Sequence, residues 1–214
     1  MLNEILEVVD ANNEQLTSEV VNGFNIVNNT FSKVRKNWQS YVLTPFISLL
    51  RKSGFHAYTH IQGVKIPAIP HDYYDVIQRI VPFCNSECNQ KYRERCLEKS
   101  TTSEIDALVI RDTNVCLIEH ATNVGGLCWD IVKLFKLSYY NKINSCLFMT
   151  WYNTEDESHL ENSKMIINLG ENIFNPNLGE KNWAIIFLPY FIEEESLNTL
   201  DLEYFHNGSF YEFK

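Results

Sequence analysis

Two carboxylates stand at the ends of apolar segments in the middle of the chain. Asp106 interrupts the apolar stretch 105–110, and Glu119 follows the apolar stretch 115–118. Turn-forming residues at 112–114 separate the two stretches, so we predict a β-hairpin that brings both carboxylates to one edge of a sheet. Desolvating such charges is costly unless something compensates them, and a divalent cation compensates two converging carboxylates. The pair therefore predicts a site for Mg²⁺ or Mn²⁺, which would activate a water and stabilise charge on a phosphate.

A structural explanation of the pair stays open beside this one. Acidic residues often end strands because their side chains reach water there, with no ligand involved. Two apolar strands, a tight turn and a following helical segment favour the site over that explanation.

The surrounding pattern predicts an α/β (α+β) protein with a mixed β-sheet flanked by helices and a helical N-terminal part. We expect helices over 2–9, from Thr17 onward, and over 31–50, with Pro45 kinking or breaking the third and Ser53-Gly54 ending it. Further expected elements are a strand at 55–61, a helix at 72–81, strands at 105–111 and 115–120, a loop at 123–126, a helix at 129–140, a strand at 145–151, a helix at 158–169, a strand at 183–190, and a hairpin at 204–213 around Asn207-Gly208.

The segments SEIDALVI (103–110) and VCLIEHA (115–121) resemble the PD-(D/E)xK superfamily of nucleases, which includes many restriction enzymes. The family hairpin has an acid on one strand and an acid-x-Lys triplet on the next, followed by a helix that flanks the sheet. Asp106 matches the first acid, Glu119 the second, and the helix expected from Trp129 follows. The resemblance covers about 103–151, and residues 31–61 would supply the preceding helix and strand.

The resemblance implies one nuclease-like domain over 1–214 with a restriction-endonuclease-like core. Within it we expect a helical N-terminal part at 1–54, an insertion at 67–102, and the core hairpin, helix and strands at 103–190.

The third position of the family triplet departs from the pattern, because residue 121 is Ala where a lysine is expected. Strand alternation places Ala121 on the same face as Glu119. Three explanations compete: Ala121 replaces a natural lysine in an engineered form, the lysine has moved to Lys133 or Lys136 on the following helix, or the domain is naturally inactive.

Each of the other candidate site residues also has an explanation that involves no ligand. Glu19 on an early helix could join the metal, or simply face solvent. Cys84, Cys88 and Cys96 could bind zinc with a fourth ligand, although free buried thiols are the simpler explanation. Lys91, Arg93 and Arg95 in the same segment could contact nucleic-acid phosphates, or form a solvated face.

Composition and resemblance together lead to one principal functional hypothesis. The net charge of −9 argues against a general nucleic-acid coat protein but not against a nuclease. We expect a Mg²⁺- or Mn²⁺-dependent DNA endonuclease of the restriction or defence type that acts on double-stranded DNA and is inactive in this form through Ala121. A restriction enzyme would act as a homodimer, because palindromic sites match two-fold symmetry. The alternatives are a catalytically dead module that binds nucleic acid or protein, and a viral-polymerase-type RNA endonuclease.

The cellular location is predicted from what the chain contains. Six irregularly spaced cysteines indicate free thiols or a metal site rather than disulfides. The N-terminus has no signal-peptide pattern, and the apolar runs are shorter than a membrane span requires. We therefore expect an intracellular, cytoplasmic protein with no membrane partner.

Overall fold

The computed structural model describes residues 1–30, 38–80, 96–97, 100–121, 124–141, 143–152, 157–189 and 201–214. The helices are α1 (Leu2–Ala11), α2 (Asn13–Thr30), α3 (Trp38–Lys52), α4 (Tyr74–Ile80), α6 (Val124–Tyr140) and α7 (Glu157–Leu178), with short 3-10 turns at His71–Tyr73 and Glu180–Asn182. The strands are β1 (His56–Ile66), β2 (Thr101–Arg111), β3 (Asn114–Ala121), β4 (Ser145–Tyr152), β5 (Trp183–Pro189), β6 (Glu203–His206) and β7 (Ser209–Glu212).

The strands form one mixed sheet whose spatial order, β1 to β7, follows the sequence. Strands β1, β2 and β3 are antiparallel, and β3, β4 and β5 are parallel. The hairpin β6–β7 continues the sheet antiparallel to β5. The parallel connections run through α6 and α7, as βαβ crossovers require. The predicted α/β class with a mixed sheet is confirmed.

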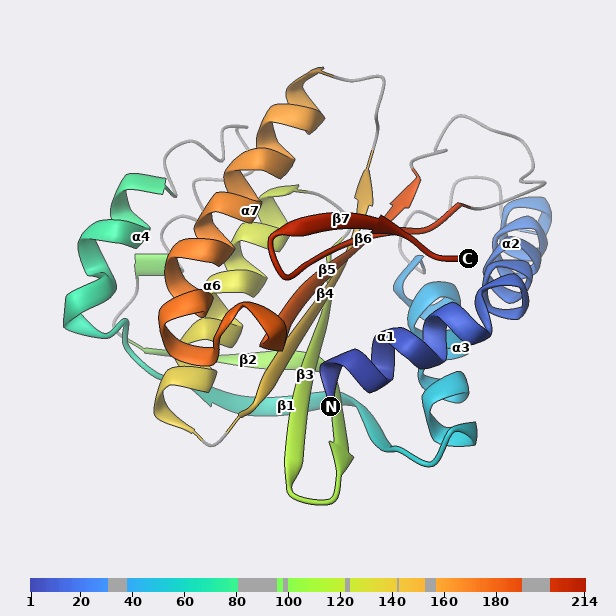
Figure 1. The fold of residues 1–214 in the computed structure, drawn as a ribbon, viewed down its shortest axis with the longest axis horizontal. Helices are drawn as coiled ribbons and strands as arrows, with labels where there is room; N and C mark the ends of the chain where they lie inside the picture. Colours follow the sequence, from blue (N-terminus) through green and yellow to red (C-terminus); the bar gives the residue numbers. More distant parts are fainter. Residues whose placement is uncertain are drawn as a thin grey trace.

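Helices cover both faces of the sheet (Figure 1). Helices α1, α2 and α3 pack on one face around residues such as Phe46, Val109 and Ile118. Helices α4, α6 and α7 pack on the other face around residues such as Phe135 and Phe148. Strand alternation explains the two cores, because Ile118 and Leu117 are neighbours in sequence and face opposite sides. None of the described helices combines the length and apolarity needed to cross a membrane.

The N-terminal helices differ in part from the sequence expectation. Helix α2 begins at Asn13, and the Thr17 hydroxyl donates to the Asn13 carbonyl at 2.8 Å, so Thr17 lies inside the first turns and does not open the helix. Pro45 was predicted to kink or break helix α3, and the break is wrong, because the helix runs through Pro45 and the packing of its buried face outweighs the lost hydrogen bond. Helix α3 ends as predicted at Gly54, whose φ of +86° suits a glycine after a helix. The first third of the predicted 31–50 helix lies outside the described residues.

Two C-terminal-half helices are longer than their patterns predicted. Helix α6 begins at Val124, so the predicted loop at 123–126 is wrong where it is described. Helix α7 was expected to stop before Gly170 but continues to Leu178, because Ile173 and Phe174 beyond the glycine are fully buried. Buried contacts here outweigh the low helix propensity of glycine.

The closing hairpin follows its turn residues closely. Asn207 and Gly208 have φ of +50° and +74°, the left-handed values of a two-residue type I′ turn. The predicted hairpin at 204–213 is confirmed with β6 and β7 on either side of that turn.

Candidate active site

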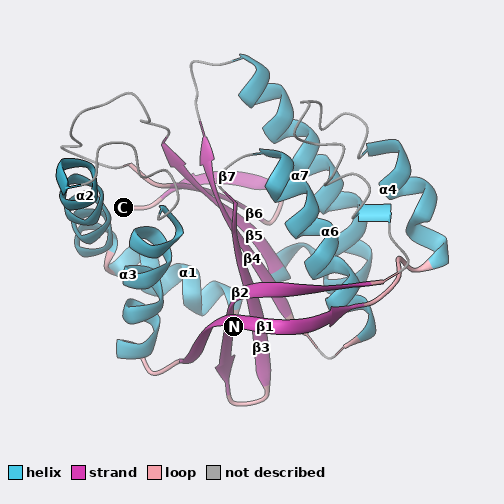
Figure 2. Ribbon diagram, turned by 180° about the vertical axis from the view of Figure 1, so that it is seen from behind, coloured by secondary structure: helices cyan, strands magenta, loops and turns pink. Residues whose placement is uncertain are grey.

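The site begins where β2 and β3 separate. Their Cα pairing runs from Arg111 opposite Asn114 to Ala107 opposite Ile118. Beyond it, β1 and the first part of β2 turn away from β3 towards α4 (Figure 2). At the point of separation the backbone N–H of His120 donates to Asp106 Oδ2 at 2.7 Å. The Asp106 carboxylate thus accepts a hydrogen bond from a strand N–H that would otherwise be donated to a backbone carbonyl oxygen of the neighbouring strand.

Glu119 lies next to this opening and meets a lysine from the following helix. The Lys133 ammonium on α6 is 2.8 Å from Glu119 Oε1 and donates to the Glu104 carbonyl oxygen on β2 at 3.1 Å. The side chains of both ion-pair partners are buried, with 4% exposed for Lys133 and 2% for Glu119. One of the two helix lysines named as replacements for residue 121 therefore lies at the expected acid. The other, Lys136, lies over the Trp129 ring, with its ammonium 5.6 Å from the ring centroid.

Asp130 is a further acidic residue of the site. It precedes Lys133 by one helical turn, and its Oδ1 lies 3.0 Å from the Lys133 ammonium. Asp130 was not among the site residues predicted from the sequence, although its three-residue spacing from Lys133 is typical of an ion pair on one helix face. Asp130 and Glu119 together hold the ammonium between the helix and the sheet.

Burial sets unusual proton affinities at these groups. Burial raises the pKa of the Glu119 carboxyl well above its ordinary value, and the charges of Asp130 and Asp106 raise it further against the opposing effect of Lys133. Burial raises the pKa of Asp130 from 3.8 to about 6, again opposed by Lys133. Desolvation alone would lower the pKa of Lys133, but Asp130 and Glu119 outweigh it and raise that pKa. Lys133 is therefore a permanent cation at neutral pH.

The carboxylates suit a divalent cation by charge and by chemistry. With all four groups ionised, Asp106, Glu119, Asp130 and Lys133 carry two net negative charges, matching one divalent ion. In the part of the chain that the structure describes, no three His, Cys, Asp or Glu side chains gather closely enough to bind a metal ion. Mg²⁺ needs only one or two carboxylates because it keeps several waters. Asp106 and Glu119 fit that limited requirement.

Residue 121 lies on the same face of β3 as Glu119. Ala121 is buried among the residues that face α6 and α7, two residues beyond Glu119 on β3. Its Cα partner on β4 is Thr150, whose side chain is buried. His120 alternates to the opposite side of the strand, and burial lowers its pKa to about 4, so its ring is neutral at pH 7.

A hydrogen-bonded pair of side chains lies beside the Lys133 contact on the outer strands. His60 Nδ1 is 2.9 Å from Glu104 Oε1, and both side chains are partly exposed. His60 has a φ of +54° next to a register shift between Ile61 and Val64 on β1. A bulge there bends the strand, as bulges do in edge strands. The Glu104 side chain thus faces solvent, while its carbonyl oxygen anchors Lys133.

The predicted third acid, Glu19, is not part of this group. Helix α2 belongs to the layer on the opposite face of the sheet from α6. Glu19 is exposed and accepts a hydrogen bond from Gln15 Nε2 at 2.8 Å. The solvent-facing alternative for this residue is the one that the structure supports.

Several candidate residues lie outside the described part of the chain. These are Cys84 and Cys88 of the possible zinc site, and Lys91, Arg93 and Arg95 of the possible phosphate contact. Cys96 is described, and it is a buried free thiol, as are Cys116 and Cys146, while Cys128 is also buried.

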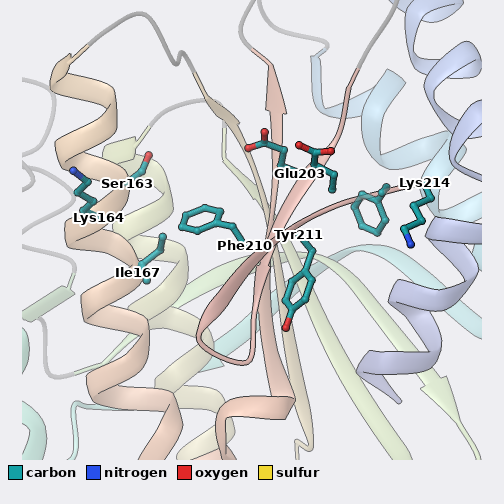
Figure 3. Close-up of a pocket in the computed structure, with 9 residues that line it drawn as sticks. Ser163, Lys164, Ile167, Glu203, Phe210, Tyr211 and Lys214 are labelled. Carbon is teal, nitrogen blue, oxygen red and sulfur yellow. The ribbon is translucent and has the colours of Figure 1, made fainter.

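A pocket of about 800 Å³ lies between α7 and the β6–β7 hairpin (Figure 3). Phe210 points from the hairpin towards Ile167 on α7, and Lys164 lies one turn away on the same helix (Figure 3). The residues that line the pocket are Ser163, Lys164, Ile167, Glu203, Phe210, Tyr211, Glu212, Phe213 and Lys214. Its two lysines are balanced by two glutamates, and it includes none of the residues around Lys133.

Comparison of the chain with protein-family models, with curated proteins and with solved structures found no match.

Proposed function

We propose that this chain is a Mg²⁺- or Mn²⁺-dependent endonuclease of the PD-(D/E)xK type in which Lys133 replaces the lysine expected at position 121. Asp106 and Glu119 would hold the cation. Duplex DNA is the proposed substrate, in keeping with a restriction or defence role.

The observation that carries this proposal is the 2.8 Å contact between the Lys133 ammonium and Glu119 Oε1. In the family triplet, the acid and the lysine share one strand face. Here alanine stands at 121, and a lysine from α6 reaches the same acid from above that face. The contact favours a relocated lysine over an engineered or naturally inactive site, because a dead site has no need of a buried ammonium.

The arrangement of elements supports the same proposal. Helix α3 and strand β1 precede the hairpin β2–β3 that carries the two acids, and α6 follows it and covers the sheet. Strand β4 then pairs parallel to β3. The resemblance implied this order of a helix, a strand, an acidic hairpin, a flanking helix and a further strand.

The residues of the site would divide the work as follows. When bound, the cation would supply a polarised water and positive charge at the phosphate. Asp130 and the Glu104 carbonyl fix the direction of the Lys133 side chain by ion pair and hydrogen bond. Because its raised pKa keeps Lys133 protonated, it would orient the attacking water and neutralise phosphate charge by donating hydrogen bonds, not by taking a proton.

The test is cleavage of duplex DNA, single-stranded DNA and RNA in Mg²⁺ or Mn²⁺ by four forms of the chain. These are the wild type, Lys133→Met, the double variant Ala121→Lys with Lys133→Met, and Lys52→Met as a control at an exposed lysine on the opposite helical layer. We expect Lys133→Met to lose about 10²- to 10³-fold in rate, as for the loss of one hydrogen-bond donor to developing charge. The double variant should recover part of it by restoring the family triplet, and Lys52→Met should cut like the wild type.

The outcomes separate the candidate functions. Preference for RNA over DNA would point to the RNA endonuclease alternative. If the wild type cuts no substrate with either metal, the catalytic proposal is wrong, and a binding module is the better description. Wild-type activity in a folded Lys133→Met variant would remove Lys133 from the mechanism.

A further inference from the structure

Strand β4 carries two buried hydroxyl groups for which the described residues provide no hydrogen-bond partner. Ser145, at the start of the strand, is 1% exposed, and Thr150, near its end, is 2% exposed. A buried polar group without a partner costs about 1–3 kcal/mol. Each buried hydroxyl therefore requires an explanation. The two explanations can differ, because the hydroxyls lie at opposite ends of the strand.

Thr150 lies at the candidate active site. It is the Cα partner of Ala121 in the parallel β3–β4 pair. This pairing lies at the carboxyl-terminal ends of the two strands. Thr150 is two residues beyond Phe148, which belongs to the core facing α6 and α7, so strand alternation places it on the face of Glu119. Ser145 is at the other end of the strand, opposite Cys116.

The Thr150 hydroxyl lies on the side of the site where the residues discussed so far provide no hydrogen-bond donor. Lys133 approaches from the β2 side, where it contacts Glu119 and the Glu104 carbonyl. On the β4 side, Ala121 offers no polar group. A phosphate placed beside Asp106 and Glu119 would need a donor on that side, because carboxylates only accept hydrogen bonds. Ligands also gather at the carboxyl edges of parallel strands in α/β sheets.

We propose that Thr150 is a substrate-contacting residue whose hydroxyl donates a hydrogen bond to a non-bridging oxygen of the scissile phosphodiester. This assignment rests on the proposed nuclease function. The hydroxyl is buried without a partner among the described residues because its partner arrives with the substrate. Lys133 and Thr150 then hold the phosphate from the two sides of β3.

The experiment compares Thr150→Val, Thr150→Ser and Ser145→Ala by thermal unfolding and by kcat/KM on the best substrate. Valine keeps the shape of threonine and removes the hydroxyl, so Thr150→Val should raise Tm while lowering kcat/KM about 10- to 100-fold, the value of a hydrogen bond to a charged group. Thr150→Ser keeps the hydroxyl and should cut within about threefold of the wild type. Ser145→Ala should raise Tm with unchanged kcat/KM.

Each other result overturns the inference. If the wild type cuts and Thr150→Val cuts equally well, Thr150 does not contact the substrate, while the nuclease function stands. If Thr150→Val loses both Tm and activity and serine does not restore activity, the residue is structural. If the wild type cuts nothing, the proposed function and the contact fail together.

Discussion

At the scale of single residues, the candidate site is governed by buried charge. Glu119, Asp130 and Lys133 are each less than a tenth exposed, and the ammonium lies within 3.0 Å of a carboxylate oxygen of each acid. Buried ion pairs are rarely a source of net stability, because desolvation offsets the attraction. Their position in a helix–sheet interface is in keeping with the proposed catalytic site, since perturbed charges concentrate at functional sites.

The shifted pKa of Asp130 predicts how stability depends on pH in the metal-free protein. Its folded pKa of about 6 exceeds the ordinary 3.8, so its stabilising effect is complete below about pH 4 and is lost as pH rises through about 6. One pKa unit corresponds to about 1.4 kcal/mol, so the loss is roughly 3 kcal/mol. Between pH 4 and 7 in the presence of a chelator, the free energy of unfolding measured with denaturant should decrease less for Asp130→Asn than for the wild type.

The control for that measurement is Asp72→Asn, whose side chain is 85% exposed and should leave the curve unchanged. Parallel curves for Asp130→Asn and the wild type would contradict the assignment of this pH dependence to Asp130.

At the scale of elements, the packing of helix α7 against strand β5 depends on the close approach of Gly170 to the Trp183 ring. A Cβ added at Gly170 would lie 2.6 Å from Cζ3 and 2.7 Å from Cη2 of Trp183. Trp183 is nearly fully buried, and its Nε1 donates to Asn175 Oδ1 at 2.7 Å, so the ring has little freedom to move. The glycine just beyond the predicted helix end is thus the residue that lets the helix lie against the sheet.

Gly170→Ala should therefore destabilise the protein despite a gain of about 1 kcal/mol in helix propensity. Overpacking of this kind costs roughly 1–3 kcal/mol, which chemical unfolding would detect as a lower midpoint. In a Trp183→Phe background the smaller ring should relieve the contact, so the added alanine should cost less there. An alanine variant more stable than the wild type would show that the ring can move aside.

At the scale of the whole molecule, the site joins three separate parts of the chain. Asp106 and Glu119 come from the central hairpin, Asp130 and Lys133 from α6, and Thr150 from β4. A cation bound by the first two would therefore hold the outer antiparallel strands against the parallel part of the sheet. Binding to the folded state alone stabilises a protein by mass action.

Mg²⁺ should accordingly raise Tm in the wild type and not in Asp106→Asn. At a concentration 100 times Kd the gain is about 2.7 kcal/mol, or roughly 5–10 °C for a chain of this size. Glu180→Asn, an exposed position away from the hairpin, should respond to Mg²⁺ as the wild type does. An equal rise in Asp106→Asn would place the cation elsewhere.

Much of the fold followed from local patterns. The strand that contains Asp106, the strand that ends near Glu119 and the turn between them were predicted from apolar runs and turn residues, and the structure contains them. The helix end at Gly54 and the turn at Asn207-Gly208 also followed from their residue types. These features depend on neighbours within a few positions, which a sequence displays directly.

What only the tertiary structure decided depends on how distant elements pack. The sequence left Lys133 and Lys136 as equal alternatives, and the packing of α6 on β3 and β4 places Lys133 at Glu119. The same layering puts Glu19 on the far side of the sheet, and the parallel pairing of β3 with β4 sets Thr150 beside Ala121. Periodicity predicts which residues share a face of one element, but contacts between elements depend on their register and crossing, which no local pattern specifies.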